Sequence, residues 1–246
     1  MYNIAIPSYK REQQLQEKTL RVLEKYNLPP DRVTIFVANK QQKEVYDESL
    51  KNNIYNNVQL AVPTIGAARN FIEQEFYNEG DYVVSFDDDL TGIYRWVNEK
   101  KIEEIQDIEN ELINAGLEAM MQTGSKCWGI YAASNPYFMS NTTTTKLSYI
   151  IASCYGFIAT HDPFLNRETN HGEDYEYSIR QYIRNGKVFR FNNLTVKTKY
   201  FGTGGLEEYR NNRYIYESIS RIEEMFPNHC TMYFKKDGRA ELRLKK

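Results

Sequence analysis

Three adjacent carboxylates, Asp87, Asp88 and Asp89, are the residues of this chain best suited to chemistry. They directly follow the apolar run Tyr82 to Phe86, which is typical of a buried strand. Adjacent negative charges repel one another, by an energy on the order of a few kcal/mol where they are partly desolvated. A bound cation would offset this repulsion, and Mg²⁺ and Mn²⁺ prefer carboxylate oxygens and often bridge to substrate phosphates. The cluster therefore indicates a divalent cation site; the alternative is a solvated acidic turn.

A second acidic pair, Glu173 and Asp174, lies in the segment His171-Gly172-Glu173-Asp174-Tyr175. Gly172 permits a turn, and acids in the first turn of a helix interact favourably with its positive end. Helix capping alone would explain the pair. The functional interpretation is a general base, because a carboxylate within hydrogen-bond reach of an acceptor hydroxyl can take its proton. Asp174 and Glu173 are both candidates for this base.

Two glycine-containing segments are suited to binding an anion. In Thr64 to Asn70, Gly66 permits close approach at a helix start, where free N–H groups attract anions, and Arg69 adds a charge suited to a diphosphate. In Phe201 to Gly205, a flexible amide-rich loop could close over phosphates, and it precedes Arg210 and Arg213. This second segment lacks the lysine of a P-loop. Either segment could instead be an ordinary connecting loop.

The elements that must position these residues alternate along the first third of the chain. Apolar runs predict strands at 4–6, 33–37, 58–62 and 82–86, and helical periodicity predicts helices at 12–26 and from about residue 66. Continuous apolar strands separated by helices indicate an α/β fold with a parallel sheet covered on both faces. Ligands bind at the carboxyl ends of such strands, so Pro7 to Arg11 and Asp87 to Asp89 should meet at one rim.

The second half of the chain has a less regular pattern. Helices are predicted at 103–122, 174–185 and 207–225, and a strand at 128–132. Residues 148–160 fit one bent strand or two short ones. The chain of 246 residues suits one large α/β domain, or such a domain with a small appendage.

Composition and charge restrict the possible partners and the compartment. The formal charge of −2 argues against a strongly basic nucleic-acid binder, yet residues 226–246 hold six basic and two acidic side chains. A solvated basic tail would explain that excess. Three scattered cysteines, Cys127, Cys154 and Cys230, suit a reducing compartment. The sequence shows neither a signal peptide nor a membrane-spanning run, so we expect a soluble cytoplasmic protein.

Four segments, in the order in which they occur along the chain, resemble the GT-A glycosyltransferases. Ile6 to Arg11 is similar to their first nucleotide-contacting loop, and Gly66 to Asn70 to the helix start near the donor. Asp87 to Asp89 resembles their Asp-x-Asp motif, and Glu173-Asp174 resembles the Glu-Asp motif of inverting members. The resemblance implies a Rossmann-like, mostly parallel sheet flanked by helices. It divides the domain into a nucleotide-sugar-binding half (1–90), an acceptor and catalytic half (91–205), and a C-terminal helix with a basic tail (206–246).

The resemblance also implies a role for each matching residue. Asp89 and Asp87 would hold Mn²⁺ or Mg²⁺, and Asp174, or alternatively Glu173, would act as the base. The donor, expected to be a UDP sugar, would contact Pro7, Ser8, Tyr9, Arg11, Gly66, Arg69, Asp87, Asp88, Gly204 and Gly205. Many GT-A enzymes place a metal-binding histidine after the Glu-Asp helix. This chain has none between His171 and His229, so the resemblance names no third protein ligand.

A narrower resemblance concerns the acceptor. The compact size, the Ile-Pro-Ser-Tyr-Lys-Arg opening and the Gly-Thr-Gly-Gly-Leu segment resemble the TET/J-binding-protein-associated glycosyltransferases, a largely viral family. This implies transfer to 5-hydroxymethylpyrimidines in DNA, such as 5-hydroxymethylcytosine in a bacteriophage genome. The basic tail would then contact phosphates, together with Arg180, Arg184, Lys187 and Arg190.

Three other functions compete with that interpretation. An intracellular transferase acting on a glycan or protein needs no basic surface, and the net charge of −2 is compatible with it. A non-enzymatic binding module would not need Asp87, Asp89, Glu173 and Asp174 together. A sugar-nucleotide-forming nucleotidyltransferase would carry a glycine-rich first loop with arginine, which is not seen here. The transferred sugar and the oligomeric state are not specified by the sequence.

Overall fold

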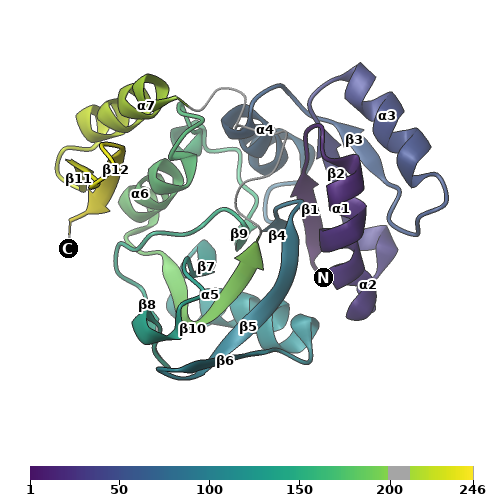
Figure 1. Cartoon of the computed structure of the whole chain (residues 1–246), viewed down its shortest axis with the longest axis horizontal. Helices are drawn as coiled ribbons and strands as arrows, with labels where there is room; N and C mark the ends of the chain where they lie inside the picture. Colours follow the sequence, from purple (N-terminus) through teal and green to yellow (C-terminus); the bar gives the residue numbers. More distant parts are fainter. Residues whose placement is uncertain (199–210, 246) are drawn as a thin grey trace.

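The chain folds into an α/β structure around one large mixed sheet (Figure 1). The structure, a computed structural model, describes residues 1–198 and 211–245. The sheet has the strand order β3-β2-β1-β4-β9-β7-β10-β5-β6, and a short strand, β8, pairs with β10. A separate two-stranded sheet, β11-β12, lies near the C-terminus. No helix among the described residues combines the length and the apolar character needed to span a membrane.

The first part of the chain supplies the parallel strands. These are β1 (Asn3–Pro7), β2 (Val33–Val37), β3 (Val58–Leu60) and β4 (Tyr82–Phe86), and β1 pairs in parallel with both β2 and β4. The connecting helical segments are α1 (Glu12–Leu15), the π-helical turn η1 (Gln16–Leu20), α2 (Arg21–Lys25), the 3₁₀ turn η2 (Pro30–Arg32), α3 (Lys40–Leu50), α4 (Ile65–Phe71) and the π-helical turn η3 (Ile72–Phe76). The predicted parallel α/β sheet is confirmed.

The second part extends the sheet mainly with antiparallel pairs. Its strands are β5 (Leu90–Asn98), β6 (Lys101–Glu104), β7 (Cys127–Tyr131), β8 (Thr143–Thr144), β9 (Cys154–Ile158) and β10 (Phe189–Thr198). Its helical segments are η4 (Glu109–Asn114), α5 (Ala115–Thr123), η5 (Pro136–Phe138), η6 (Pro163–Leu165) and α6 (Glu173–Asn185). The segment 148–160 contains one strand, β9, which pairs antiparallel with both β4 and β7.

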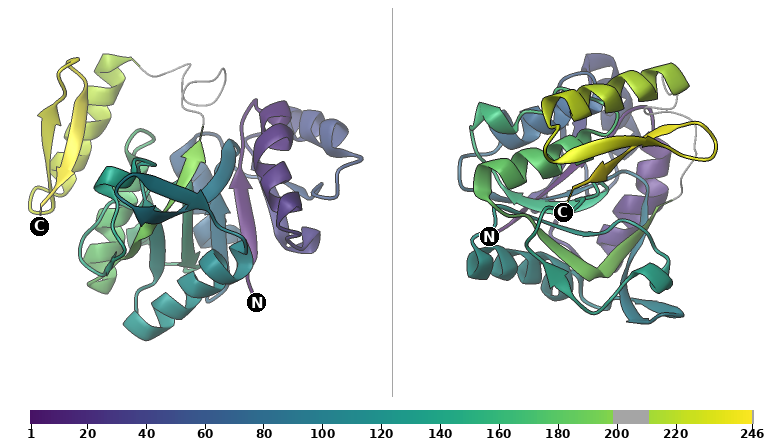
Figure 2. Two further views of the ribbon diagram at one scale, coloured as in Figure 1. Left: turned by 60° about the horizontal axis from the view of Figure 1, so that its bottom comes forward. Right: turned by 90° about the vertical axis from the view of Figure 1, so that its left-hand side faces the viewer.

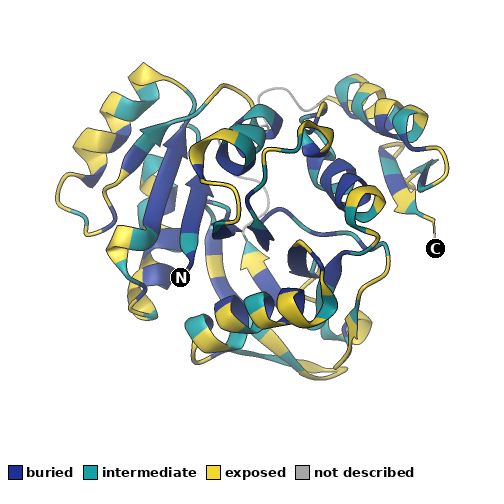
Figure 3. Ribbon diagram, turned by 180° about the vertical axis from the view of Figure 1, so that it is seen from behind, coloured by how far each residue is buried: buried dark blue, intermediate teal, exposed yellow. Residues whose placement is uncertain are grey.

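Helices cover both faces of the sheet, as the alternation of side chains along each strand requires. Ile4 and Ile6 of β1 face a core shared with α1, α2, α3 and α5, whereas Ala5 faces a second core shared with η3 and α6. The central strands are accordingly buried along their length, as Figure 3 shows. This burial fixes the positions of the strand ends, from which the polar loops emerge.

One predicted boundary needs correction, and one helix was not predicted. The helix expected to start at Glu103 begins only after Asp107, because 101–104 forms β6 in a hairpin with β5. There, Ile105 and Ile108 are buried beside the sheet, so their spacing mimicked the start of a helix. The sequence analysis also missed α3, whose only fully buried side chains are Tyr46 and Leu50. Such a narrow apolar stripe gives little periodic signal.

The basic C-terminal segment, for which a solvated tail was one explanation, is folded. After α7 (Asn212–Met225), the chain forms an antiparallel hairpin of β11 (Cys230–Phe234) and β12 (Ala240–Leu244). Its inner residues Cys230, Ala240 and Leu242 are buried against Ile215 and Ile219 of α7. Figure 2 shows this helix and hairpin packed together beside α6. The basic side chains are therefore displayed on a folded C-terminal unit, residues 211–245.

Trp128 holds the centre of the sheet together. Its ring is fully buried, and its indole N–H donates a hydrogen bond to the hydroxyl of Tyr82 on β4 (2.8 Å). Glycines at positions 116 and 156 make room for the ring, because a Cβ at either position would lie 2.2 Å from the indole nitrogen. Gly156 is on β9, directly between β4 and β7.

We therefore predict that Gly156→Ala destabilises the protein. The added methyl group would clash with the Trp128 ring, and such overpacking typically costs about 1–3 kcal/mol of unfolding free energy. Thermal or denaturant unfolding measures the change. Trp128→Phe in the same chain should recover part of the loss, since the two substitutions act on one contact. Strictly additive effects of the two changes would contradict this account.

Candidate active site

A large pocket opens at the carboxyl ends of the parallel strands. Its volume is about 1120 Å³, and its lining includes residues that follow β1, β2, β3 and β4. Ten of the predicted site residues line it: Pro7, Ser8, Tyr9, Arg11, Arg69, Asp87, Asp88, Asp89, Glu173 and Asp174. The predicted meeting of the two motifs at one rim is thus what the structure shows, and the Glu-Asp pair faces the same cavity.

The backbone of the acidic turn is held from two sides. The buried hydroxyl of Thr19, in η1, donates to the carbonyl of Asp87 (2.7 Å) and accepts from the N–H of Leu90 (3.0 Å). The N–H of Asp87 donates to the carbonyl of Ser153, just before β9 (3.1 Å). The Thr19 hydroxyl therefore binds the backbone at both ends of the three-aspartate turn and fixes this turn between β4 and β5.

The middle carboxylate, Asp88, points away from solvent toward the loop after β1. It accepts a hydrogen bond from Ser8 (2.6 Å) and one from Arg11 (3.3 Å). The hydroxyl of Tyr46 contacts Ser8 Oγ (2.7 Å) and accepts from the Arg11 N–H (2.9 Å). Burial raises the pKa of Asp88, while Ser8 and Arg11 oppose this rise. Asp88 therefore ties the Ser8-to-Arg11 loop to the acidic turn.

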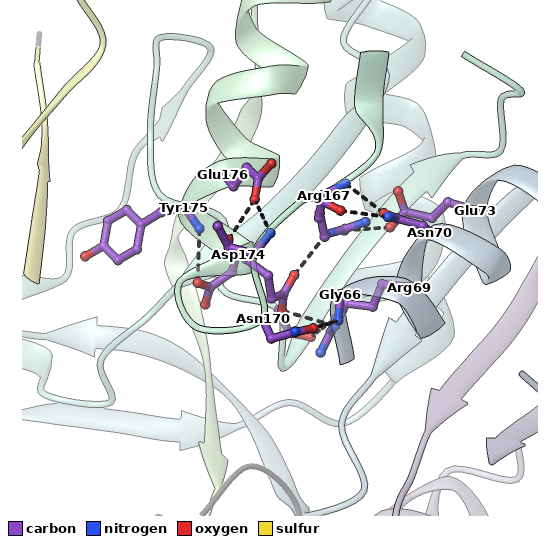
Figure 4. A network of polar contacts seen from close by, with 12 residues as sticks. Gly66, Arg69, Asn70, Glu73, Arg167, Asn170, Asp174, Tyr175 and Glu176 are labelled. Carbon is purple, nitrogen blue, oxygen red and sulfur yellow. Dashed lines mark hydrogen bonds and ion pairs between the residues drawn. The ribbon is translucent and has the colours of Figure 1, made fainter. Parts of the chain in front are cut away.

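A buried chain of charges joins the acidic turn to the start of α6. Arg69 contacts Asp87 Oδ1 (2.8 Å) and Glu173 Oε1 (3.2 Å), and Arg167 contacts Glu173 Oε2 (2.9 Å) and Glu73 Oε1 (2.7 Å). Figure 4 shows Arg69 on α4 and Arg167 extending toward Glu73. Burial alone would lower the pKa of Arg69, but Glu173, Tyr155 and Asp87 raise it. Both guanidinium groups therefore remain charged.

This network holds the Glu173 carboxylate between two arginines. Each of its carboxylate oxygens faces a buried guanidinium, and the residue is only 5% exposed. Because both oxygens are engaged in ion pairs, neither is free to contact a substrate hydroxyl. The geometry therefore favours Asp174 over Glu173 as the base and makes Glu173 a positioning residue.

Asp174 is half-buried and faces the pocket. One of its oxygens accepts a short hydrogen bond from the hydroxyl of Tyr149, and the other accepts from the N–H of Tyr175 (3.0 Å). Burial and the neighbouring charge of Glu173 raise the pKa of Asp174 to about 6. The group is therefore ionised at neutral pH, with a pKa closer to neutrality than that of an ordinary aspartate, as suits a general base.

The carboxylate oxygens of the acidic turn are suited to a divalent ion that also binds a substrate. Asp89 lines the pocket and forms no ion pair within the described part of the chain, and Asp87 keeps one oxygen outside its pair with Arg69. Across residues 1–198 and 211–245, no three His, Cys, Asp or Glu side chains gather as a metal site. Mg²⁺ is commonly held by one or two carboxylates and completed by substrate phosphates. Asp87 and Asp89 match that pattern.

Gly66 has a different part from the one predicted. It does not line the pocket; its N–H donates to the side chain of Asn170 (3.1 Å), and a Cβ there would lie 2.5 Å from the carbonyl of Thr169. The glycine therefore lets the segment before α6 pack against α4.

The predicted donor-binding residues Gly204 and Gly205, and Arg210, lie outside the described residues. Arg213 pairs with Glu217 on the exposed side of α7.

The cations predicted to contact DNA from the second half are engaged within the protein. Arg180 is buried and pairs with Glu176 and Glu168, so its predicted phosphate contact is wrong. Lys187 donates to the carbonyl of Thr123, and Arg190 donates to Asn192 and Tyr149. Arg184 is exposed but paired with Asp162.

Several site residues were missed by the sequence analysis. Tyr149 contacts Asp174 from an irregular segment, where no periodic pattern marks it. The Glu73–Arg167 pair joins residues 94 positions apart, which no local spacing reveals. The pocket is also lined by Asn211, Tyr214, Lys235 and Glu241 of the C-terminal unit. A hairpin signal in 230–244 could have placed these last residues in a folded element.

Solved structures share this architecture at low sequence identity. S. aureus TarS 1-349 in complex with UDP-GlcNAc matches with a TM-score of 0.62 at 16% identity, over 92% of this chain and 66% of that chain. Glucosyl-3-phosphoglycerate synthase from Mycobacterium tuberculosis, with Mn²⁺, UDP-Glc and phosphoglyceric acid, matches with a TM-score of 0.54 at 10% identity, over 99% and 86%. The mannosyltransferase PcManGT from Pyrobaculum calidifontis, with GDP-Man and Mn²⁺, matches with a TM-score of 0.52 at 12% identity, over 76% and 53%. The predicted GT-A fold is confirmed.

Sequence comparison identifies the family more narrowly. No curated protein matches this sequence. One family profile, described as TET-Associated Glycosyltransferase, matches residues 2–205, which include both acidic motifs and every element that carries them. With the fold, the shared pocket and this match over most of its length, the chain belongs to the TET-Associated Glycosyltransferase family.

Proposed function

We propose that this protein transfers a sugar, with inversion, from a UDP sugar to the hydroxyl of a 5-hydroxymethylpyrimidine in DNA, with the help of Mn²⁺ or Mg²⁺. The observation that carries the proposal is the single pocket shared by the acidic turn and Asp174. A donor-binding rim and a half-buried base face one cavity, which is the arrangement that a direct displacement needs.

The donor end of the pocket is suited to a nucleotide diphosphate. Tyr9 and Arg11 follow β1, Asn39 follows β2, and Thr64 precedes α4. Thr64 has a positive φ of 75°, which is strained for a residue with a branched Cβ and is typical of functional sites. The family membership and the UDP-GlcNAc and UDP-Glc of two structural neighbours support a UDP sugar as the donor.

The acidic turn would hold the divalent ion through Asp89 and Asp87. Such an ion neutralises charge that develops on the leaving diphosphate. Arg69 pairs with the Asp87 carboxylate, and Thr19 fixes the backbone of the turn that carries Asp89, so the turn is positioned before any ligand binds. The Mn²⁺ in two neighbours supports this assignment.

Asp174 would take the proton of the acceptor hydroxyl. As the acceptor oxygen bonds to the anomeric carbon, the bond from that carbon to the diphosphate oxygen breaks, and the proton passes to Asp174. A single displacement of this kind inverts the anomeric configuration. The Tyr149 hydroxyl holds one oxygen of Asp174 and so orients the carboxylate.

The description of the matching family, TET-Associated Glycosyltransferase, supports a DNA acceptor, because the resemblance to that family implies transfer to 5-hydroxymethylpyrimidines in DNA. We expect mass spectrometry to detect sugar addition to DNA containing 5-hydroxymethylcytosine or 5-hydroxymethyluracil after incubation with a panel of UDP sugars. Matched DNA with unmodified bases is the control. Transfer to glycan or protein acceptors alone would reject the DNA assignment.

Asp174→Asn should reduce turnover by about 10²–10⁴-fold, because it removes the general base. Donor affinity should change little. The folded-state pKa of Asp174 lies above its unfolded value, so the ionised group costs stability above about pH 6. The variant should therefore unfold at no lower a temperature than the wild type at pH 7.5.

The raised pKa of Asp174 also leads to a prediction for the pH dependence of turnover. In the wild type, activity should fall as the pH drops through about 6, where Asp174 becomes protonated. The kcat of Asp174→Asn should lack this acid limb. If donor affinity collapses in the variant while turnover survives, Asp174 binds the donor and is not the base.

Asp89→Asn should abolish most activity while leaving the fold intact, since it removes the carboxylate that is free to hold the ion. Asp31→Asn, an exposed aspartate outside the pocket, is the matched control. Excess chelator should reproduce the loss in the wild type, and added Mn²⁺ or Mg²⁺ should restore activity. Full activity in Asp89→Asn, or in chelator, would refute metal dependence.

A further inference from the structure

One wall of the pocket comes from a segment outside the family match. Asn211, Tyr214, Lys235 and Glu241 line the cavity, whereas the family profile ends at residue 205. In Figure 1, α7 and the β11-β12 hairpin lie on the other side of α6 from α1 and β1. The base at the start of α6 therefore separates the donor rim from this C-terminal wall.

The C-terminal unit is firmly attached to α6. Ile179 of α6 packs in one buried cluster with Ile215, Ile219 and Leu242 of the unit. On the surface, Glu168 bridges Arg180 of α6 and Arg221 of α7 at 2.9 and 2.7 Å. The wall is thus held at a defined position beside the base.

Two tyrosines, Tyr149 beside Asp174 and Tyr214 of α7, line the pocket. Tyr149, which contacts Asp174, stacks on Tyr175 with ring centroids 4.2 Å apart and an interplanar angle of 25°. In Figure 4, Tyr175 extends from α6 on the side of the C-terminal hairpin. Tyr214 of α7 also faces the pocket.

The pocket has room for more than the donor. Sites for one small ligand or cofactor typically occupy about 300–1,000 Å³, and this cavity measures about 1120 Å³. A planar ring bound against aromatic side chains, with its hydroxymethyl group toward Asp174, would fill the space beyond the donor.

We propose that the C-terminal unit forms the acceptor subsite, in which Tyr214 stacks on the extruded pyrimidine and Lys235 binds a neighbouring DNA phosphate. This inference rests on the proposed function and assigns its acceptor to named residues. An extruded base is usually held by aromatic stacking, and lysine is suited to phosphate.

Charge on the hairpin supports the phosphate contact. Residues 230–245 carry five basic and two acidic side chains. Lys235 pairs with Glu241 across the hairpin, and its side chain is 44% exposed. Exposed pairs contribute only about 0–1 kcal/mol, so a phosphate can replace Glu241 as the partner of Lys235 at small cost.

The test compares two acceptors and two matched pairs of variants. The acceptors are a duplex oligonucleotide with one 5-hydroxymethylcytosine and the free nucleoside 5-hydroxymethyl-2′-deoxycytidine, which lacks phosphate. Tyr214→Ala is paired with Tyr216→Ala, an exposed tyrosine on the same helix that stacks on Phe234 outside the pocket. Lys235→Gln is paired with Lys236→Gln, whose side chain does not line the pocket.

Tyr214→Ala should raise the acceptor KM for both substrates by about 5–150-fold, the equivalent of one lost base–aromatic stack. Lys235→Gln should raise the KM for the oligonucleotide only. It should also flatten the slope of log affinity against log salt by about 0.9, as expected for one phosphate. The control variants should behave as wild type, and the Kd of UDP, measured by calorimetry, should stay constant throughout.

The possible failures are distinguishable. If the wild type modifies hydroxymethylated DNA but Tyr214→Ala and Lys235→Gln leave both acceptor KM values unchanged, this inference is overturned and the proposed function stands. If the wild type transfers sugar to no hydroxymethylated DNA, both are overturned. Should Tyr214→Ala fail to fold, the exposed Lys235 still decides the result through the oligonucleotide-to-nucleoside comparison.

Discussion

The site depends on one buried ionic connection, in which Glu173 receives Arg69 on one oxygen and Arg167 on the other. Burying charges is costly, and removing one partner of such a pair typically costs about 3–5 kcal/mol because the remaining charge is left uncompensated. Arg69 also contacts Asp87, so the connection runs from the acidic turn to the first turn of α6. It sets the separation between the residues that would hold the donor and the residue that would deprotonate the acceptor.

The parallel and antiparallel parts of the sheet contribute differently to that arrangement. The parallel strands, buried on both faces, fix the rim from which the acidic turn emerges. The antiparallel extension brings β9 against β4, so that Ser153 reaches Asp87. Helix α6 then packs on one side against the sheet and on the other against α7. Asp174, at the start of α6, consequently lies where the three parts of the chain meet.

Local sequence patterns predicted the parallel strands, the rim and the two acidic motifs, because strands show short-range periodicity and each acidic motif consists of adjacent residues. They did not reveal the partners of those motifs. Glu73 and Arg167 look like ordinary surface charges until folding brings them together, and Tyr46 belongs to a helix with too few apolar residues to be recognised. The hairpin of residues 230–244 was hidden by its charges, because the basic residues masked the alternation of Cys230, Ala240 and Leu242 with polar neighbours. Gly66 was identified correctly as a point of close approach, but the group that approaches it is the protein's own backbone.

The π-helical turn Gln16–Leu20 also affects how this chain should be aligned with other sequences. A π turn closes its hydrogen bonds over one residue more than an α-helical turn does. Leu15 and Leu23, before and after this turn, are buried in the core, and Thr19 within it contacts the acidic turn. A homologue with a regular α-helix in this place would be one residue shorter, and a gapless alignment would pair the wrong residue with Thr19. Alignments of this segment should therefore be anchored on the hydroxyl that holds the aspartates, with the length difference placed inside the turn.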